Sequence, residues 1–111
     1  EPWGYTPLES VACHIPTITT DLAGFGRWAK KYSERIENGV EVIHRTDSNW
    51  REVVGAVAGA MHRFLSADPK EQNTARLAAA KIAAKASWSK FFCYYQQAYD
   101  IALSKAAQRN K

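Results

Sequence analysis

The chain has 111 residues, of which 46% are apolar and 23% charged, a composition typical of one small globular domain and not of a disordered segment. Fifteen basic and eleven acidic side chains give a net charge of +4, and the excess lies in residues 67–111, which hold eight basic and three acidic residues. Only two cysteines, Cys13 and Cys93, are present, so we expect no disulfide framework and a reducing, cytoplasmic setting. Charged residues interrupt every apolar stretch well before the roughly 20 residues of a membrane span, and the first residues do not read as a secretory leader. We therefore expect neither membrane insertion nor secretion.

The first 47 residues alternate between helical and extended patterns. Thr6-Pro7-Leu8-Glu9 combines a capping hydroxyl, a proline at the first helical position and a Glu three residues after the cap, which predicts a helix to about His14. The β-branched residues 15–20 predict an extended segment, followed by a glycine-containing turn over 21–26. A second helix is expected over 27–37 and a second strand over 40–44.

The pattern of residues 48–111 predicts helices only. Apolar residues fall at helical spacing from Ser48 until Asp68-Pro69, which we take as the end of that helix. The alanine-rich residues 72–86 have high helix propensity, and a last helix begins near Ser87. Its broad apolar face has eight members: Trp88, Phe91, Phe92, Tyr95, Tyr99, Ala102, Leu103 and Ala106.

This order of elements predicts the fold class. Helices alternating with strands are typical of a parallel sheet with crossover helices, but two strands are too few for a stable sheet. The chain also starts at Glu1-Pro2 with no initiator methionine. We therefore expect a fragment of a longer α/β protein, in which this chain is itself mostly α-helical with two short strands.

The segment before the first predicted helix offers the best candidate for a binding site. A helix N-terminus presents backbone N–H groups and a partial positive charge, so the amides around Gly4, Tyr5 and Thr6 would suit a phosphate or diphosphate. Glu1 would then face the group attached to that phosphate, and Glu9 could accept hydrogen bonds from the hydroxyls of a sugar. The alternative is that Glu9 only completes a capping box with Thr6 and that Glu1 is a surface charge.

Other residue types that often carry chemistry give weaker signals. The three histidines, His14, His44 and His62, match no metal-ligand spacing, so we expect no metal site. The basic residues of the C-terminal part are spread along the chain, and its aromatic residues recur at helix-core spacing, which favours a packed helix over a nucleic-acid-binding surface.

Two regions of the sequence carry a resemblance to a known family. Residues 1–9 (EPWGYTPLE) and 15–26 (IPTITTDLAGFG) closely resemble the donor-site region of the glycogen synthases of glycosyltransferase family 3. Residues 87–106 resemble the C-terminal helix of that family, through Ser87-Trp88, Tyr94-Tyr95 and the segment 102–106. The resemblance is weak between these regions.

The resemblance implies a retaining, metal-independent glucosyltransferase of the two-domain GT-B architecture. Such an enzyme transfers glucose from UDP-glucose or ADP-glucose to the end of an α-1,4-glucan. It would place residues 1–47 at the end of the Rossmann-like nucleotide-sugar-binding domain and residues 48–111 in C-terminal helices.

The family's motif also assigns roles to single residues. Glu1 would lie at the donor glucose as the catalytic carboxylate, and Glu9 would hold the ribose hydroxyls. Gly4, Tyr5 and Thr6 would bind the diphosphate, and Trp3 would shape the pocket. Animal and fungal members of the family carry a dense arginine cluster that senses glucose 6-phosphate, and here it is reduced to Lys70, Arg76 and Lys81. We therefore expect weak or absent activation by that sugar phosphate, as in a bacterial-type member.

Two further interpretations stay open, and the weaker of them is the nucleic-acid-binding surface considered above. The chain could be a stand-alone helical module that binds another protein through its aromatic helix, with no catalytic activity. In the family this helix packs on the N-terminal domain, so in the chain alone its apolar face would lack a partner, and self-association would cover it.

Overall fold

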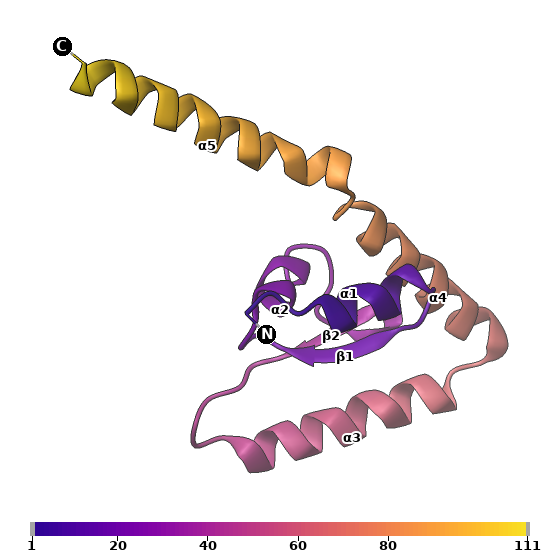
Figure 1. Ribbon diagram of the computed structural model, residues 1–111. Helices are drawn as coiled ribbons and strands as arrows, with labels where there is room; N and C mark the ends of the chain where they lie inside the picture. The colour runs from indigo at the N-terminus through magenta and orange to yellow at the C-terminus, as the bar shows by residue number, and fades with distance from the viewer. Residues whose placement is uncertain (1, 111) are drawn as a thin grey trace.

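The computed structural model describes residues 2–110, and it confirms a mostly helical chain with two short parallel strands. In chain order the elements are α1 (Tyr5–Ala12), β1 (Thr17–Thr20), α2 (Gly24–Ala29), the 3-10 helix η1 (Ile36–Asn38), β2 (Val40–Ile43), α3 (Trp50–Ser66), α4 (Pro69–Ala84) and α5 (Trp88–Arg109). The two strands pair in register from Thr17 beside Val40 to Thr20 beside Ile43. Helices α1, α2 and α4 lie on one side of this sheet and α3 lies on the other (Figure 1).

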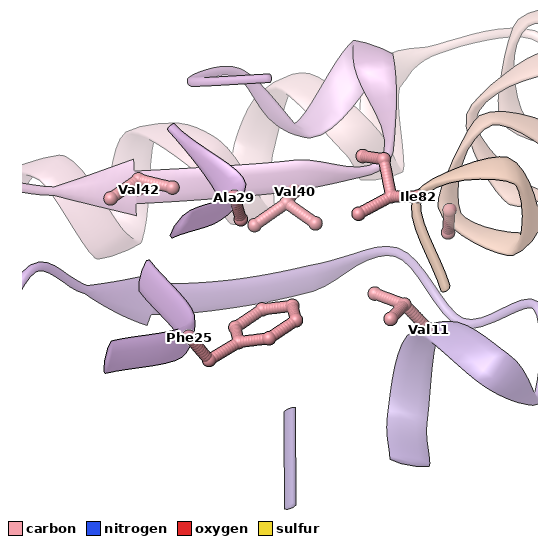
Figure 2. Packing of buried hydrophobic residues seen from close by; sticks show 7 residues of the cluster. Val11, Phe25, Ala29, Val40, Val42 and Ile82 are labelled. Atoms are coloured by element: carbon pink, nitrogen blue, oxygen red, sulfur yellow. The ribbon is translucent and has the colours of Figure 1, made fainter. Parts of the chain in front are cut away.

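The core lies between the sheet and the three helices of one layer. It consists of small and branched side chains around one phenylalanine: Val11, Phe25, Ala29, Val40, Val42, Ala79 and Ile82 (Figure 2). All four residues of β2 are buried, because helices cover both faces of this strand. Val40 and Val42 join the core, whereas Glu41, on the alternate face, bonds to Arg63 of α3.

Helix α1 begins earlier than predicted. Its N-cap is Gly4, in the left-handed conformation at φ 99°, so Thr6 is the second residue of the helix. The predicted capping box of Thr6 and Glu9 is therefore wrong. A side chain at position 4 would place its Cβ 3.3 Å from that of Phe25, so both the conformation and the close packing require glycine. The helix ends at Ala12, two residues before the predicted end.

The predicted helix over 27–37 is also wrong. Helix α2 begins at Gly24, inside the turn predicted over 21–26, and it ends at Ala29, after which the chain turns into η1. Tertiary hydrogen bonds explain the difference, because Ser33 Oγ donates to the carbonyl oxygen of Val40 at 2.7 Å and the amide of Ile36 donates to Glu41 Oε1 at 2.7 Å. Contacts with β2 thus outweigh the local helix preference of this segment.

Asp68 and Pro69 start a helix as well as following one. The Asp68 side chain accepts from the amide of Glu71 at 2.8 Å, the Glu71 side chain accepts from the amide of Asp68, and Pro69 occupies the first turn of α4. Helix α4 therefore begins three residues before the predicted Gln72. The D-P-x-E pattern is itself a capping-box signature, so the sequence contained this signal.

The two long outer helices leave much of their apolar surface exposed. On α3 only Ala60 is buried, and Leu65 is 72% exposed, because a two-stranded sheet is too narrow to cover the helix. None of the α5 residues is buried, and the helix extends away from the rest of the chain (Figure 1). The radius of gyration, 17.8 Å, accordingly exceeds the roughly 13 Å of a compact domain of this length. Between residues 2 and 110, no helix is long and apolar enough to cross a bilayer.

Candidate functional site

The segment before α1 is held by the glycine-containing first turn of α2. The amide of Gly24 donates to the carbonyl oxygen of Pro2 at 2.9 Å, and the amide of Phe25 donates to the carbonyl oxygen of Trp3 at 2.5 Å. A Cβ at Gly24 would lie 2.7 Å from Cε3 of the Trp3 indole. The glycines of this turn therefore allow close approach of the chain to itself, and they place residues 2–4 beside the first turn of α2.

The N-terminus of α1 presents its first turn at the surface. Tyr5 is 60% exposed and Thr6 is exposed, whereas the capping Gly4 is buried. The first turn contains no acidic side chain to offset the positive end of the helix dipole. Pro7 lacks an N–H, so the backbone amides at this end of the helix are those of Gly4, Tyr5 and Thr6.

Glu9 lies one turn into α1 and is exposed. It is separated from Tyr5 by four residues and from Thr6 by three, so the carboxylate belongs to the same helix face as the first turn. The structure thus brings five of the six predicted site residues, Trp3 to Thr6 and Glu9, to one end of one helix. Glu1, the predicted catalytic carboxylate, lies outside the described residues.

Trp3 belongs to an aromatic cluster. Its ring lies 6.3 Å from Phe25, 6.0 Å from Trp28 and 5.8 Å from Phe91, measured between centroids. It also lines an open apolar pocket of about 470 Å³ between α1, α2 and the start of α5, together with Tyr5 and Trp88. Trp3 therefore connects the first segment of the chain to α2 and to α5.

Asp21 is a residue that the sequence did not single out. It follows β1 directly, and its Oδ2 lies 2.7 Å from Nδ1 of His44, which follows β2. Its Oδ1 accepts from the amide of Arg45 at 2.9 Å, and Lys30 Nζ lies at 4.0 Å. The His44 hydrogen bond, the Arg45 amide and the nearby cations hold the pKa of Asp21 below its ordinary value. In open parallel sheets this carboxyl edge is where ligands bind, and that rule could have identified Asp21.

A second charged cluster lies on the α3 side of the sheet. The guanidinium of Arg63 donates through Nη2 to the buried Glu41 at 2.5 Å and through Nε to Glu37 at 2.8 Å. Two hydrogen bonds raise the pKa of Arg63: the one to Glu41 has the larger effect and the one to Glu37 the smaller. This cluster neutralises a carboxylate inside the fold, and we assign it a structural role.

The histidines do not form a common site. His44 pairs with Asp21, and in the part of the chain that the structure describes no group of three or more His, Cys, Asp or Glu side chains lies close enough together to hold a metal ion.

Comparison with known proteins identifies the family. The family model described as glycogen synthase matches residues 1–110. The glycogen [starch] synthase of Caenorhabditis elegans is 30% identical over 106 residues, which are 95% of this chain and 16% of that protein. The glycogen [starch] synthase isoform 1 of Saccharomyces cerevisiae is 27% identical over 109 residues, and the liver glycogen [starch] synthase of Homo sapiens is 26% identical over 107 residues. Each alignment covers 96% of this chain and 15% of the relative. The chain thus spans about a sixth of the length of these relatives, and it belongs to the glycogen synthase family.

Proposed function

We propose that the protein containing this chain transfers glucose, with retention of configuration and without a metal, from UDP-glucose or ADP-glucose to the non-reducing end of an α-1,4-glucan. In this proposal residues 1–47 complete the nucleotide-sugar-binding domain of a GT-B enzyme and residues 48–111 form its C-terminal helices. The observation that carries the proposal is the exposed, glycine-capped N-terminus of α1, with Glu9 on the same face, in a chain of this family.

The leaving group explains the use of a helix N-terminus. Departure of a nucleoside diphosphate builds negative charge on its oxygens, and fixed amide donors together with the helix dipole stabilise that charge. The amides of Gly4, Tyr5 and Thr6 would bind the diphosphate, and Pro7 preorganises the backbone of this first turn.

The carboxylates would act on the sugars at either end of the diphosphate. Glu9, exposed one turn into α1, would accept hydrogen bonds from the ribose hydroxyls. Glu1 would lie at the donor glucose and stabilise the oxocarbenium-like state electrostatically. Trp3 would contribute by fixing the segment between Glu1 and Gly4 through its aromatic contacts.

The test is transfer of labelled glucose from UDP-glucose and from ADP-glucose onto glycogen by the full-length protein. Glu1→Ala should lower transfer by more than about a hundredfold, the scale of losing one preorganised electrostatic group. Glu9→Gln should raise the KM for the donor about tenfold, as expected for a weakened charge-assisted hydrogen bond. Glu52→Gln, which changes an exposed carboxylate on α3, is the matched control and should behave as the wild type. Failure of the folded wild type to use either donor would refute the proposal.

The exposed face of α5 favours a second candidate function. Trp88 is 64% and Leu103 is 70% exposed, and monomeric proteins rarely leave so long an apolar face uncovered. A stand-alone interaction module, or self-association of this chain, would bury it. Light scattering of the chain, compared with Leu103→Lys, tests self-association: a mass that the substitution lowers to that of a monomer would support it, and a monomeric wild type would exclude it.

A further inference from the structure

Asp21 joins the ends of the two strands. Beyond its bonds to the His44 ring and the Arg45 amide, its own amide donates to the carbonyl oxygen of Ile43 at 3.1 Å, and its carbonyl oxygen accepts from Arg27 Nε at 2.9 Å. The Asp21 side chain is only 15% exposed. One residue therefore fixes the point at which β1 turns toward α2, relative to the end of β2.

The segment after Asp21, which contains the first turn of α2, is closely packed against the end of β1. At its far end a Cβ at Gly26 would lie 1.9 Å from the carbonyl oxygen of Thr20, so the backbone is in direct contact with the end of β1. Phe25 is completely buried in the core. Asp21 and Gly26 thus hold the two ends of the segment that carries the amides of Gly24 and Phe25.

Those two amides hold the segment that precedes α1. They donate to the carbonyl oxygens of Pro2 and Trp3, and Gly4 packs against the Phe25 side chain. The hydrogen bonds of Asp21 and those of Gly24 and Phe25 lie at the two ends of one short segment, so this segment connects the end of β2 to residues 2–4.

We propose that Asp21 is a positioning residue, which places the first turn of α2 and through it the donor-binding residues 2–6. This inference rests on the proposed function for its catalytic consequence. Asp21 itself would not touch the donor; it would set the position of the segment that does. Because its His44 partner is 70% exposed, this contact adds little to global stability, and its loss should alter the geometry of the turn more than the folding of the chain.

The first test measures the turn directly, without reference to activity. Hydrogen exchange of the Gly24 and Phe25 amides is compared in the full-length wild type, Asp21→Asn and His44→Gln. We expect at least a tenfold faster exchange of these two amides in Asp21→Asn and a smaller effect in His44→Gln, which keeps the Arg45 amide bond. The fall in Tm should be small in both variants. Asp47→Asn is the matched control, since Asp47 is an exposed carboxylate in the loop after β2. Unchanged exchange at Gly24 and Phe25 in Asp21→Asn would overturn the inference.

The second test measures the consequence for the reaction. Asp21→Asn should raise the KM for the nucleotide-sugar at least tenfold and leave the KM for glycogen unchanged, because a displacement of well under 1 Å at a binding site already has effects of this size. Equal changes in both KM values together with a lower Tm would show a general structural role and overturn the inference. If the wild type transfers no glucose, the proposed function fails, and the hydrogen-exchange result alone decides whether Asp21 positions the turn.

Discussion

Replacing Gly26 by alanine tests how tightly the first turn of α2 is packed. The added Cβ would lie 1.9 Å from the Thr20 carbonyl oxygen and 2.8 Å from its carbonyl carbon, whereas ordinary contacts begin near 3.4 Å. The difference, 3.4 − 1.9 = 1.5 Å, must come from movement of backbone, because both opposing atoms belong to the main chain. Overpacking of this kind costs about 3 kcal/mol or more.

Gly55 supplies the matched control. It lies inside α3, and a Cβ there meets no heavy atom within 4 Å. Gly55→Ala should therefore stabilise the chain by about 1 kcal/mol, the difference in helix propensity between the two residues. The same substitution is thus expected to lower the free energy of unfolding at Gly26 and to raise it at Gly55.

The assay is urea unfolding followed by far-UV circular dichroism, with thermal unfolding as a second measurement. We expect the urea midpoint to fall for Gly26→Ala and to rise for Gly55→Ala, and the Tm to change by roughly 4 °C for each kcal/mol. A Gly26→Ala variant within about 0.5 kcal/mol of the wild type would refute the reasoning, since that value is the ordinary range of a surface substitution.

Further predictions concern the charged groups. Arg63→Met should destabilise the chain by about 3 kcal/mol in urea unfolding, because Glu41 stays buried without its cation. Combining Arg63→Met with Glu41→Leu should recover most of this loss, and a double variant whose loss equals the sum of the two single losses would contradict the prediction. Asp68→Ala should cost about 1 kcal/mol through loss of the α4 cap, seen in the same assay, and an unchanged midpoint would argue against the capping box. An NMR titration of the Asp21 carboxyl should give a pKa below its ordinary value of 3.8. The stabilising contribution of this carboxylate is then complete above about pH 4 and disappears as the pH falls through the folded-state pKa. A pKa at or above 3.8 would exclude the hydrogen bonds to the carboxylate. Glucose 6-phosphate should activate the full-length enzyme less than twofold in a transfer assay, because Arg76 lies over the Phe64 ring and has no convergent basic neighbours on its helix face; a many-fold activation would contradict this.

Most of the helices and both strands could be predicted from the amino-acid sequence alone, and so could the family. The β-branched segments became β1 and β2, the alanine-rich run became α4, and the motif around Gly4 led to the correct family. These features follow from local backbone preferences and from a short contiguous motif, both of which can be read along the chain.

The ends of several elements depend instead on contacts between distant parts of the chain. Gly4 caps α1 where it lies close to Phe25, and α2 stops early because Ser33 bonds to the backbone of β2. The role of Asp21 depends on the register of two strands that are separated by 19 residues in the chain. Partners so distant in sequence leave no local pattern, and the hydrogen bonds that join them exist only once the sheet has formed.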